Sequence, residues 1–394
     1  MTSFLFVAPA VAPFGEAVMG RELAVAAHAA GHQVAFLHSS KIAPVFEGAP
    51  FKRGILDDVL PTLASAVRDA VRARNVDVVV LVDALATYGV LGASTRAFVE
   101  SCGTKVIALD LWGCRETDLG CDMGETEVRL DSVLVELPTV RPAPVARPDA
   151  PGAYRAIPDL AERMGDRAST RARLGIGEHE RVVFTATGTW QSPTKYPPAS
   201  AMHRIADAWP SALALVLRRL RDVRVLHVGP RPMPLEGSYL HVSQVPPEEF
   251  HRLLVASDVA IGNNVMATSI ASALALDVAC VVVESTRACM TIDEAGAVPE
   301  DVRRWLSSVV PLYPYAVLPL GLRRFVTPIL AGNPFADAID RCDILDPDAT
   351  AARVAALLER DPKKRDARAS YRAQIAALPS GLEQLTRLLD RPGP

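Results

Sequence analysis

Two blocks in which short apolar runs alternate with helical patterns constrain the fold of this chain more than any other feature. In the first block, continuous apolar runs predict strands over residues 4–8, 33–38, 76–82, 105–111 and 132–137. Ala-rich or amphipathic stretches predict helices over residues 15–30, 57–75 and 90–102. Strands that alternate with helices form right-handed βαβ units, so we expect a parallel sheet that is covered on both faces.

A proline-rich stretch follows the first block, with prolines at positions 138, 142, 144, 148, 151 and 158. Because proline lacks a backbone N–H, this stretch is predicted to be a linker between domains and to exclude a central strand. A second block then predicts strands over residues 181–187, 224–229, 239–242, 259–261 and 279–283, with helices over 201–221 and 269–276. The chain is mostly helical in pattern from residue 349 to its end.

The 394 residues are therefore expected to form two Rossmann-like, doubly wound parallel-sheet domains of the α/β class. The predicted N-terminal domain covers residues 1–140, the linker 141–170, and the C-terminal domain 171–394. Ligands of open α/β sheets bind outside the carboxyl ends of the strands, so a ligand cleft between the two domains is expected.

Composition narrows the classes of function. The net charge is −3 and the pI is about 6.3, which argues against non-specific nucleic-acid binding. No apolar stretch reaches the ~20 residues of a membrane span, and the first apolar run, which lacks a basic segment before it, is interpreted as a strand. Six cysteines are too few for a disulfide scaffold, so we expect a cytoplasmic protein with reduced thiols.

One segment carries a family resemblance. Residues Val245 to Ser285, VPPEEFHRLLVASDVAIGNNVMATSIASALALDVACVVVES, resemble the donor region of GT-B glycosyltransferases, most closely the MurG-like branch. The order is a helix that begins with Pro and acidic residues, a Ser-Asp pair, a strand, a turn, and a helix that opens with Thr268-Ser269-Ile270. Residues 13–37 are similar to the family's first βαβ unit. Residues 351–389 are similar to its closing helices, which cross back toward the first domain.

The resemblance implies a GT-B fold with a diphosphate site at the turn before the helix that opens with Thr268-Ser269-Ile270. The N-terminus of a helix carries unpaired N–H groups and a partial positive charge, which favour anions. Thr268 and Ser269 place hydroxyls there, next to Asn263 and Asn264 in the turn. The alternative interpretation is that Thr268 or Ser269 only caps its helix.

Several positions depart from the family pattern and indicate degenerate donor and catalytic motifs. Ser272 stands where the family usually has the acid that binds the donor ribose, and Asp277-Val278-Ala279 replaces Gly-x-Pro. Gly262–Met266 is bulkier than the usual glycine-rich turn. Glu16 stands where many members have a histidine base. Glu16 is either a general base whose pKa burial has raised, or an ordinary acidic residue of a first helical turn.

Further ligand candidates follow two strands. Trp112 and Arg115 come after the strand over 105–111, and Thr187, Gly188, Trp190 and Gln191 come after the strand over 181–187. The tryptophans are stacking surfaces for a ligand or aromatics packed on a sheet edge. Cys114 and Cys121 lack the second cysteine pair of a zinc site, so neither a metal nor a cofactor is expected.

Two hypotheses follow. In the first, the chain is a GT-B-like protein that binds a peptide or small-molecule substrate in its interdomain cleft, as a non-glycosylating accessory of partner enzymes in a bacterial-type biosynthetic pathway. In the second, it is a glycosyltransferase that uses a nucleotide sugar, with Glu16 as base and Thr268 and Ser269 on the donor diphosphate. The chain lacks the family's ribose-binding acid, turn glycines and histidine base, and these losses favour the first hypothesis. The fold itself is compatible with both hypotheses, because fold alone does not decide function.

Overall fold

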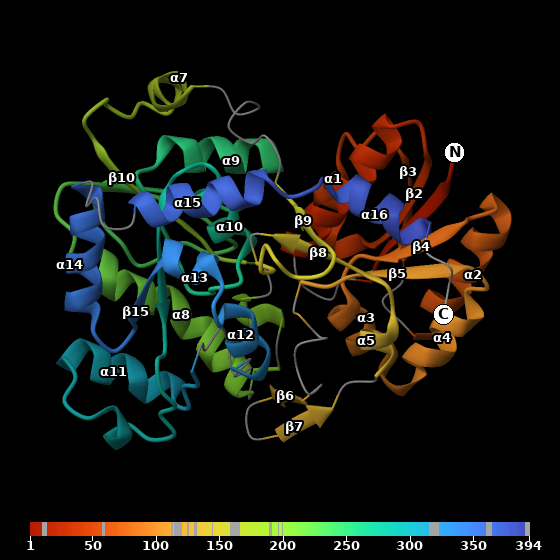
Figure 1. Ribbon diagram of the computed structural model, residues 1–394. Coiled ribbons are helices and arrows are strands. Elements are labelled where there is room, and N and C mark those ends of the chain that lie inside the picture. Colours follow the sequence, from red (N-terminus) through yellow and green to blue (C-terminus); the bar gives the residue numbers. More distant parts are fainter. Residues whose placement is uncertain are drawn as a thin grey trace.

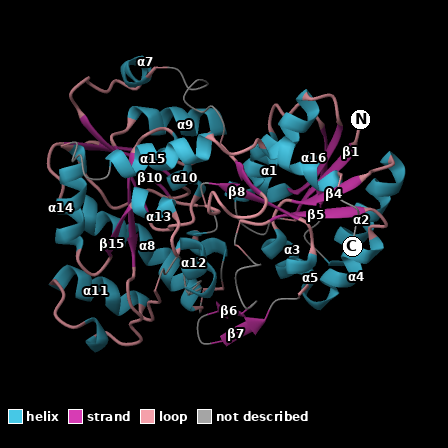
Figure 2. Cartoon of the chain, in the orientation of Figure 1, coloured by secondary structure: helices cyan, strands magenta, loops and turns pink. Residues whose placement is uncertain are grey.

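The computed structural model describes residues 1–9, 14–56, 60–111, 113, 120–123, 126–129, 132–143, 145–157, 166–188, 191–195, 197–198, 200–314, 323–359 and 365–390. Two sheets with helices on both faces lie side by side (Figure 1). Figure 2 shows that the strands of each sheet lie between layers of helices. The expected α/β class with two Rossmann-like, parallel-sheet domains is confirmed.

The N-terminal sheet has seven parallel strands in the order β3-β2-β1-β4-β5-β8-β9. Its strands are β1 Ser3–Ala8, β2 Gln33–Ser39, β3 Lys52–Leu56, β4 Val78–Leu81, β5 Lys105–Leu109, β8 Thr139–Ala143 and β9 Ala153–Arg155. The helices of this half are α1 Phe14–Ala29, α2 Leu60–Arg74, α3 Ala84–Leu91, α4 Thr95–Ser101 and α5 Val133–Glu136, with 3₁₀ turns η1 Ser40–Phe46 and η2 Gly92–Ser94. A separate hairpin pairs β6 Gly120–Met123 with β7 Thr126–Arg129.

The C-terminal sheet has six parallel strands in the order β12-β11-β10-β13-β14-β15. Its strands are β10 Arg181–Ala186, β11 Val223–Val228, β12 Tyr239–Val242, β13 Val259–Gly262, β14 Ala279–Glu284 and β15 Asp340–Asp343. Its helices are α7 Arg167–Arg173, α8 Ala201–Leu217, α9 Pro247–Ala256, α10 Thr268–Ala275, α11 Glu300–Val309, α12 Arg323–Leu330, α13 Pro334–Ala338 and α14 Pro347–Leu358, with 3₁₀ turns η5 Pro193–Lys195 and η6 Asp293–Ala295. The tail adds α15 Arg365–Ala376 and α16 Gly381–Leu389.

The expectation that the proline-rich stretch excludes a central strand is wrong, because β8 lies between β5 and β9. The backbone N–H of Arg141 donates to Gly152 O of the loop that leads into β9, so the next residue, Pro142, turns its nitrogen toward β5. The last bond to β5 runs from Asp110 N to Val140 O, and β5 has ended by the level of Pro142. Pro142 therefore occupies a position of β8 at which no backbone N–H is needed to bond to β5.

Two other predictions of secondary structure differ from the observed elements. The strand predicted over 132–137 is the short helix α5, which Arg96 of α4 holds by bonds to Ser132 and Glu136. A short apolar run does not distinguish a strand from a buried helical turn, and the next segment, β8, takes the place beside β5. The single helix predicted over 90–102 is divided into α3, η2 and α4. No helix in the described part of the chain is long and apolar enough to cross a membrane.

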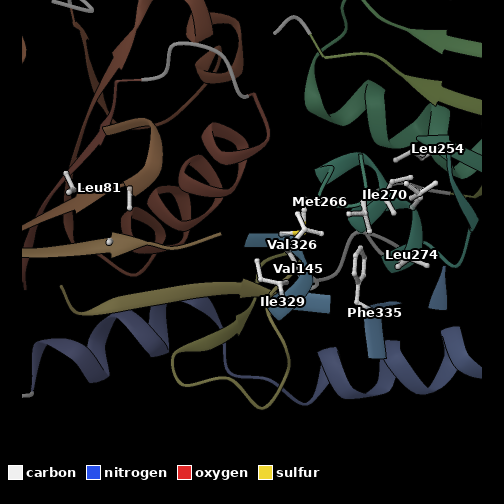
Figure 3. Packing of buried hydrophobic residues seen from close by; sticks show 14 of the residues in the cluster. Leu81, Val145, Leu254, Met266, Ile270, Leu274, Val326, Ile329 and Phe335 are labelled. Carbon is white, nitrogen blue, oxygen red and sulfur yellow. The ribbon is translucent and has the colours of Figure 1, made fainter. Parts of the chain in front are cut away.

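A continuous apolar core joins the two halves of the molecule (Figure 3). Val145, in the loop after β8, packs with Val326 and Ile329 of α12 and with Met266 of the turn before α10. Beside this core, the amide of Asn333 donates to Val145 O at 3.0 Å from a fully buried position. The relative position of the two domains is thus held by packed side chains and not only by the connecting chain.

The C-terminal tail contacts both domains. Tyr371 of α15 is buried and lies 5.9 Å, between ring centroids, from Phe335 of α13. In contrast, α16 lies against α1 and β9, where Gln384 donates to Ala153 O at 2.9 Å. Gly381 permits this approach, because a Cβ there would lie 2.8 Å from Cδ1 of Leu23. The tail therefore runs from the C-terminal domain onto the N-terminal domain (Figure 1).

Candidate functional site

The first turns of two helices meet between the domains. Helix α1 follows β1 of the N-terminal sheet, and α10 follows β13 of the C-terminal sheet, so each helix begins near the carboxyl end of a strand. A Cβ built on Gly15 would lie 1.8 Å from Oγ1 of Thr268, far inside any real contact distance. Only glycine lets the backbone of α1 come this close to α10. The first turns of α1 and α10 are thus in direct contact through Gly15 and Thr268.

Glu16 follows Gly15 in the first turn of α1 and is 8% exposed. Burial, and second the negative charge of nearby Asp83, raise the pKa of Glu16 from 4.5 to about 8. Asp83 lies two residues after the end of β4 and is 5% exposed. At neutral pH the Glu16 carboxyl is therefore mostly protonated, and near pH 8 it exchanges a proton readily. A group with such a pKa is suited to acid–base chemistry.

Sequence reasoning placed Glu16 in the site but missed Asp83. The available signal was its position, since an acidic residue directly after a buried strand reaches the ligand edge of a parallel sheet.

Thr268 and Ser269 are the first two residues of α10, as expected for an anion site. The alternative that one of them caps the helix is wrong, because the N-cap is Ala267 and no side chain caps this end. In the preceding turn, Oδ1 of Asn264 accepts from Met266 N at 2.9 Å, so Asn264 stabilises the turn. Asn263 is also buried there. The four candidates therefore lie together where β13 leads into α10.

A narrow crevice of ≈ 40 Å³ lies between α1 on one side and α9 and α10 on the other. Thr268 and Ser272 of α10 line it, together with Glu22 of α1 and Glu248 and His251 of α9. Arg21 pairs with Glu22 at 2.8 Å and reaches Glu248 at 4.0 Å, which links the two domains. Ligand pockets usually measure about 300–1,000 Å³, so this crevice admits only a small group.

The carboxyl end of β10 carries a second set of candidates. Gln191 is buried, and its Oε1 accepts from Gly188 N at 2.8 Å, which closes the turn after the strand. Oγ1 of Thr187 lies 3.1 Å from Nε2 of His227, whose Nδ1 lies 2.8 Å from the hydroxyl of Tyr239. Trp190 lies outside the described residues, as do Trp112 and Arg115.

The hydrogen bonds around His227 join Thr187, His227 and Tyr239 in one chain. The backbone N–H of Met233 donates to one lone pair of the Tyr239 hydroxyl at 2.8 Å, so that oxygen keeps a proton and a second lone pair for Nδ1 of His227. Burial, and second the neighbouring His241, lower the pKa of His227 to about 4, so the ring is neutral at pH 7. The tautomer of the neutral ring sets which of Thr187 and His227 donates in the bond between them. No motif indicated this chain of bonds, because the histidines are scattered along the sequence.

No group of three or more metal-ligating side chains occurs among the residues that the structure places. The site therefore consists, in the described part of the chain, of buried carboxyls on the N-terminal side and hydroxyl, amide and imidazole groups on the C-terminal side. Such a set can bind polar ligands and transfer protons.

Comparison with solved structures identifies the fold. The spinosyn forosaminyltransferase SpnP is similar over 98% of each chain, with a TM-score of 0.61 at 16% sequence identity. The spinosyn rhamnosyltransferase SpnG, complexed with thymidine diphosphate, matches over 99% of this chain and 100% of its own, with a TM-score of 0.56 at 14% identity. The glycosyltransferase SnogD from Streptomyces nogalater covers 99% of both chains, with a TM-score of 0.54 at 15% identity. These similarities confirm the GT-B fold.

Sequence comparison gives a family but no function. No curated protein matches the sequence. A family model described as "Family of unknown function (DUF6365)" matches residues 23–393, which is most of the chain. The chain therefore belongs to the DUF6365 family.

Proposed function

We propose that this protein binds a peptide or small-molecule substrate in its interdomain cleft, as a non-glycosylating accessory of partner enzymes in a bacterial-type biosynthetic pathway. The observation that carries the proposal is the contact between Gly15 and Thr268. In the family resemblance, the N-terminus of α10 is the place of a nucleotide diphosphate. Here the backbone of α1 at Gly15 packs against the side chain of Thr268 at that place.

The charge around this contact also disfavours a diphosphate. Glu22 and Glu248 border the crevice next to Thr268, and their carboxylates repel an anion. Ser272 replaces the ribose-binding acid, and its side chain is too short to reach the same position. The loss of a charged hydrogen bond of this kind costs about 1.5–3 kcal/mol, or roughly ten- to a hundredfold in affinity.

The polar groups that remain suit a different ligand. Glu16 and Asp83 on one side, and Thr187 with Asn263 on the other, lie at or just beyond the carboxyl ends of parallel strands. Binding sites of α/β proteins are formed at these ends. Hydroxyl, amide and protonated carboxyl groups donate to carbonyl oxygens, which a peptide or a carbonyl-bearing small molecule offers.

A glycosyltransferase activity is the second candidate function. The solved structures with the same fold carry glycosyltransferase names, and at least three of them are complexes with thymidine diphosphate. Glu16, with its pKa raised to about 8, has the position and acidity of a general base. In this reaction Glu16 takes the proton of an acceptor hydroxyl, the hydroxyl oxygen bonds to the sugar carbon, and the nucleoside diphosphate leaves from Thr268 and Ser269.

A turnover assay separates the two functions. The full chain is incubated with UDP- and dTDP-sugars and a panel of peptide and small-alcohol acceptors, and nucleoside diphosphate release is measured. We expect release at the background rate, unchanged in the Glu16→Gln variant. Release that Glu16→Gln abolishes would refute the accessory function and establish the second candidate.

A further inference from the structure

The crevice between α1, α9 and α10 carries negative charge contributed by both domains. Glu22 comes from the N-terminal domain and Glu248 from the C-terminal domain. Arg21 pairs with both, so the two carboxylates and one guanidinium leave a net charge of −1. The side chain of Glu248 is 54% exposed, and it is therefore free to turn toward an entering group. A cation is attracted into this crevice and an anion is repelled.

Ser272 gives a second and independent indication of a ligand. It lines the crevice and is 4% exposed, yet its hydroxyl makes no hydrogen bond to another residue in the described part of the chain. This hydroxyl opens onto the crevice, so water or an entering ligand can supply the hydrogen bond that the protein does not. Ser272 Oγ can accept from an N–H donor at this point, with the carboxylate of Glu248 on the neighbouring helix α9 and that of Glu22 across the crevice on α1.

The size and the remaining walls limit what can enter. A water-sized group needs about 10–15 Å³, so the ≈ 40 Å³ crevice has room for a small head group and its first methylenes. Val18 and Met19 of α1, Ile157 after β9, and Pro247 of α9 form the apolar part of the lining. An alkyl stem fits against these side chains while its head reaches the polar end.

We propose that this crevice binds a primary ammonium group carried on an alkyl or peptide stem. Its three N–H donors match the carboxylates of Glu22 and Glu248 and the hydroxyl of Ser272. The inference rests on the proposed function, in which no nucleotide occupies this place, and it defines the ligand class further: the bound peptide or small molecule bears an amine. The family's diphosphate position thus takes a ligand group of opposite charge.

The experiment uses n-pentylammonium chloride as the probe and n-pentanol as its neutral counterpart, each titrated into the full chain at low salt. We expect pentylammonium to bind with a Kd on the order of 1 mM and pentanol about tenfold more weakly. Added salt should weaken only the charged probe. Glu248→Gln and Ser272→Ala should each raise the Kd of pentylammonium about fivefold or more. Glu249→Gln is the matched control, because Glu249 lies on the same helix but pairs with Arg173 and Arg252.

Equal binding of the two probes, or unchanged affinity in both Glu248→Gln and Ser272→Ala while each variant keeps the melting curve of the parent, would overturn the amine site. The same titrations include thymidine diphosphate, which keeps the two proposals distinguishable. If neither pentylammonium nor thymidine diphosphate binds, only the amine site is wrong. If thymidine diphosphate binds and pentylammonium competes with it poorly or not at all, the proposed function is wrong as well.

Discussion

Replacement of Glu16 by Gln should stabilise the protein at pH 8 and leave its stability near pH 5 almost unchanged. The carboxyl of Glu16 titrates at 4.5 in its ordinary state and near 8 in the fold. Between these values the folded state holds a proton that the unfolded state has lost, so stability falls as the pH rises. Each pH unit in this window costs about 1.4 kcal/mol, and the whole window approaches a loss of about 5 kcal/mol. Gln keeps the shape of the protonated acid and removes the titration.

The assay is guanidinium unfolding of the wild type and of Glu16→Gln at pH 5, 6, 7 and 8. The difference between the two proteins is the relevant quantity, because His227, with its pKa lowered to about 4, contributes in the opposite direction and loses stability as the pH falls below about 6.5. We expect a difference below about 1 kcal/mol at pH 5 that grows to about 2–4 kcal/mol at pH 8. Asp83→Asn should reduce the pH dependence, since the charge of Asp83 is part of its cause.

Glu22→Gln serves as the control on the same helix and should leave the slope between pH 5 and pH 8 unchanged, because Glu22 is paired with Arg21 at the edge of the crevice. The wild-type stability could instead stay level from pH 5 to pH 8, with the Glu16→Gln curve parallel to it. That result would show that Glu16 is ionised in the fold and would refute the raised pKa of Glu16 beside Asp83.

Three further predictions concern how the domains are held together. Gly15→Ala should destabilise by about 1–3 kcal/mol through overpacking against Thr268, and Thr268→Ala in the same chain should restore part of the loss; additive effects in this double-mutant cycle would contradict the contact. Asn333→Ala should cost about 1–3 kcal/mol in chemical unfolding, because it leaves a buried carbonyl between the domains unpaired; a change below about 0.5 kcal/mol would argue that this bond is not formed. Deletion from Asp366 onward removes the buried Tyr371 and should lower the melting temperature by several degrees or more, whereas an unchanged melting curve would show that the tail does not dock.

The arrangement of strands followed from the sequence because buried parallel strands are continuous apolar runs. The runs over 4–8, 33–38 and 181–187 became β1, β2 and β10 within one residue. The errors occurred where this signal is ambiguous. The apolar run over 132–137 is a helical turn, and β8 contains Pro142, which is tolerated only because β5 ends before that level. A rule about proline in strands needs the neighbours of the strand, which a sequence does not supply.

The candidate site was predictable in its parts but not in its geometry. The strand-end rule located Thr187, which directly follows β10, whereas the family resemblance located Glu16 and Thr268, which lie in the first turns of α1 and α10. The contact of Gly15 with Thr268 depends on how the domains pack, and residues about 250 positions apart give no local signal of it. The negative charge of the crevice likewise depends on how the domains pack, because Glu22 and Glu248 belong to different domains.

The closed diphosphate position is the central claim, and isothermal titration of thymidine diphosphate into the full chain tests it most directly. With Gly15 against Thr268 and two carboxylates beside them, we predict no saturable binding up to about 1 mM nucleotide, at low and at moderate salt. A saturable Kd in the micromolar range would contradict the account, above all if Thr268→Ala weakened it, because the helix N-terminus would then be open to a diphosphate after all.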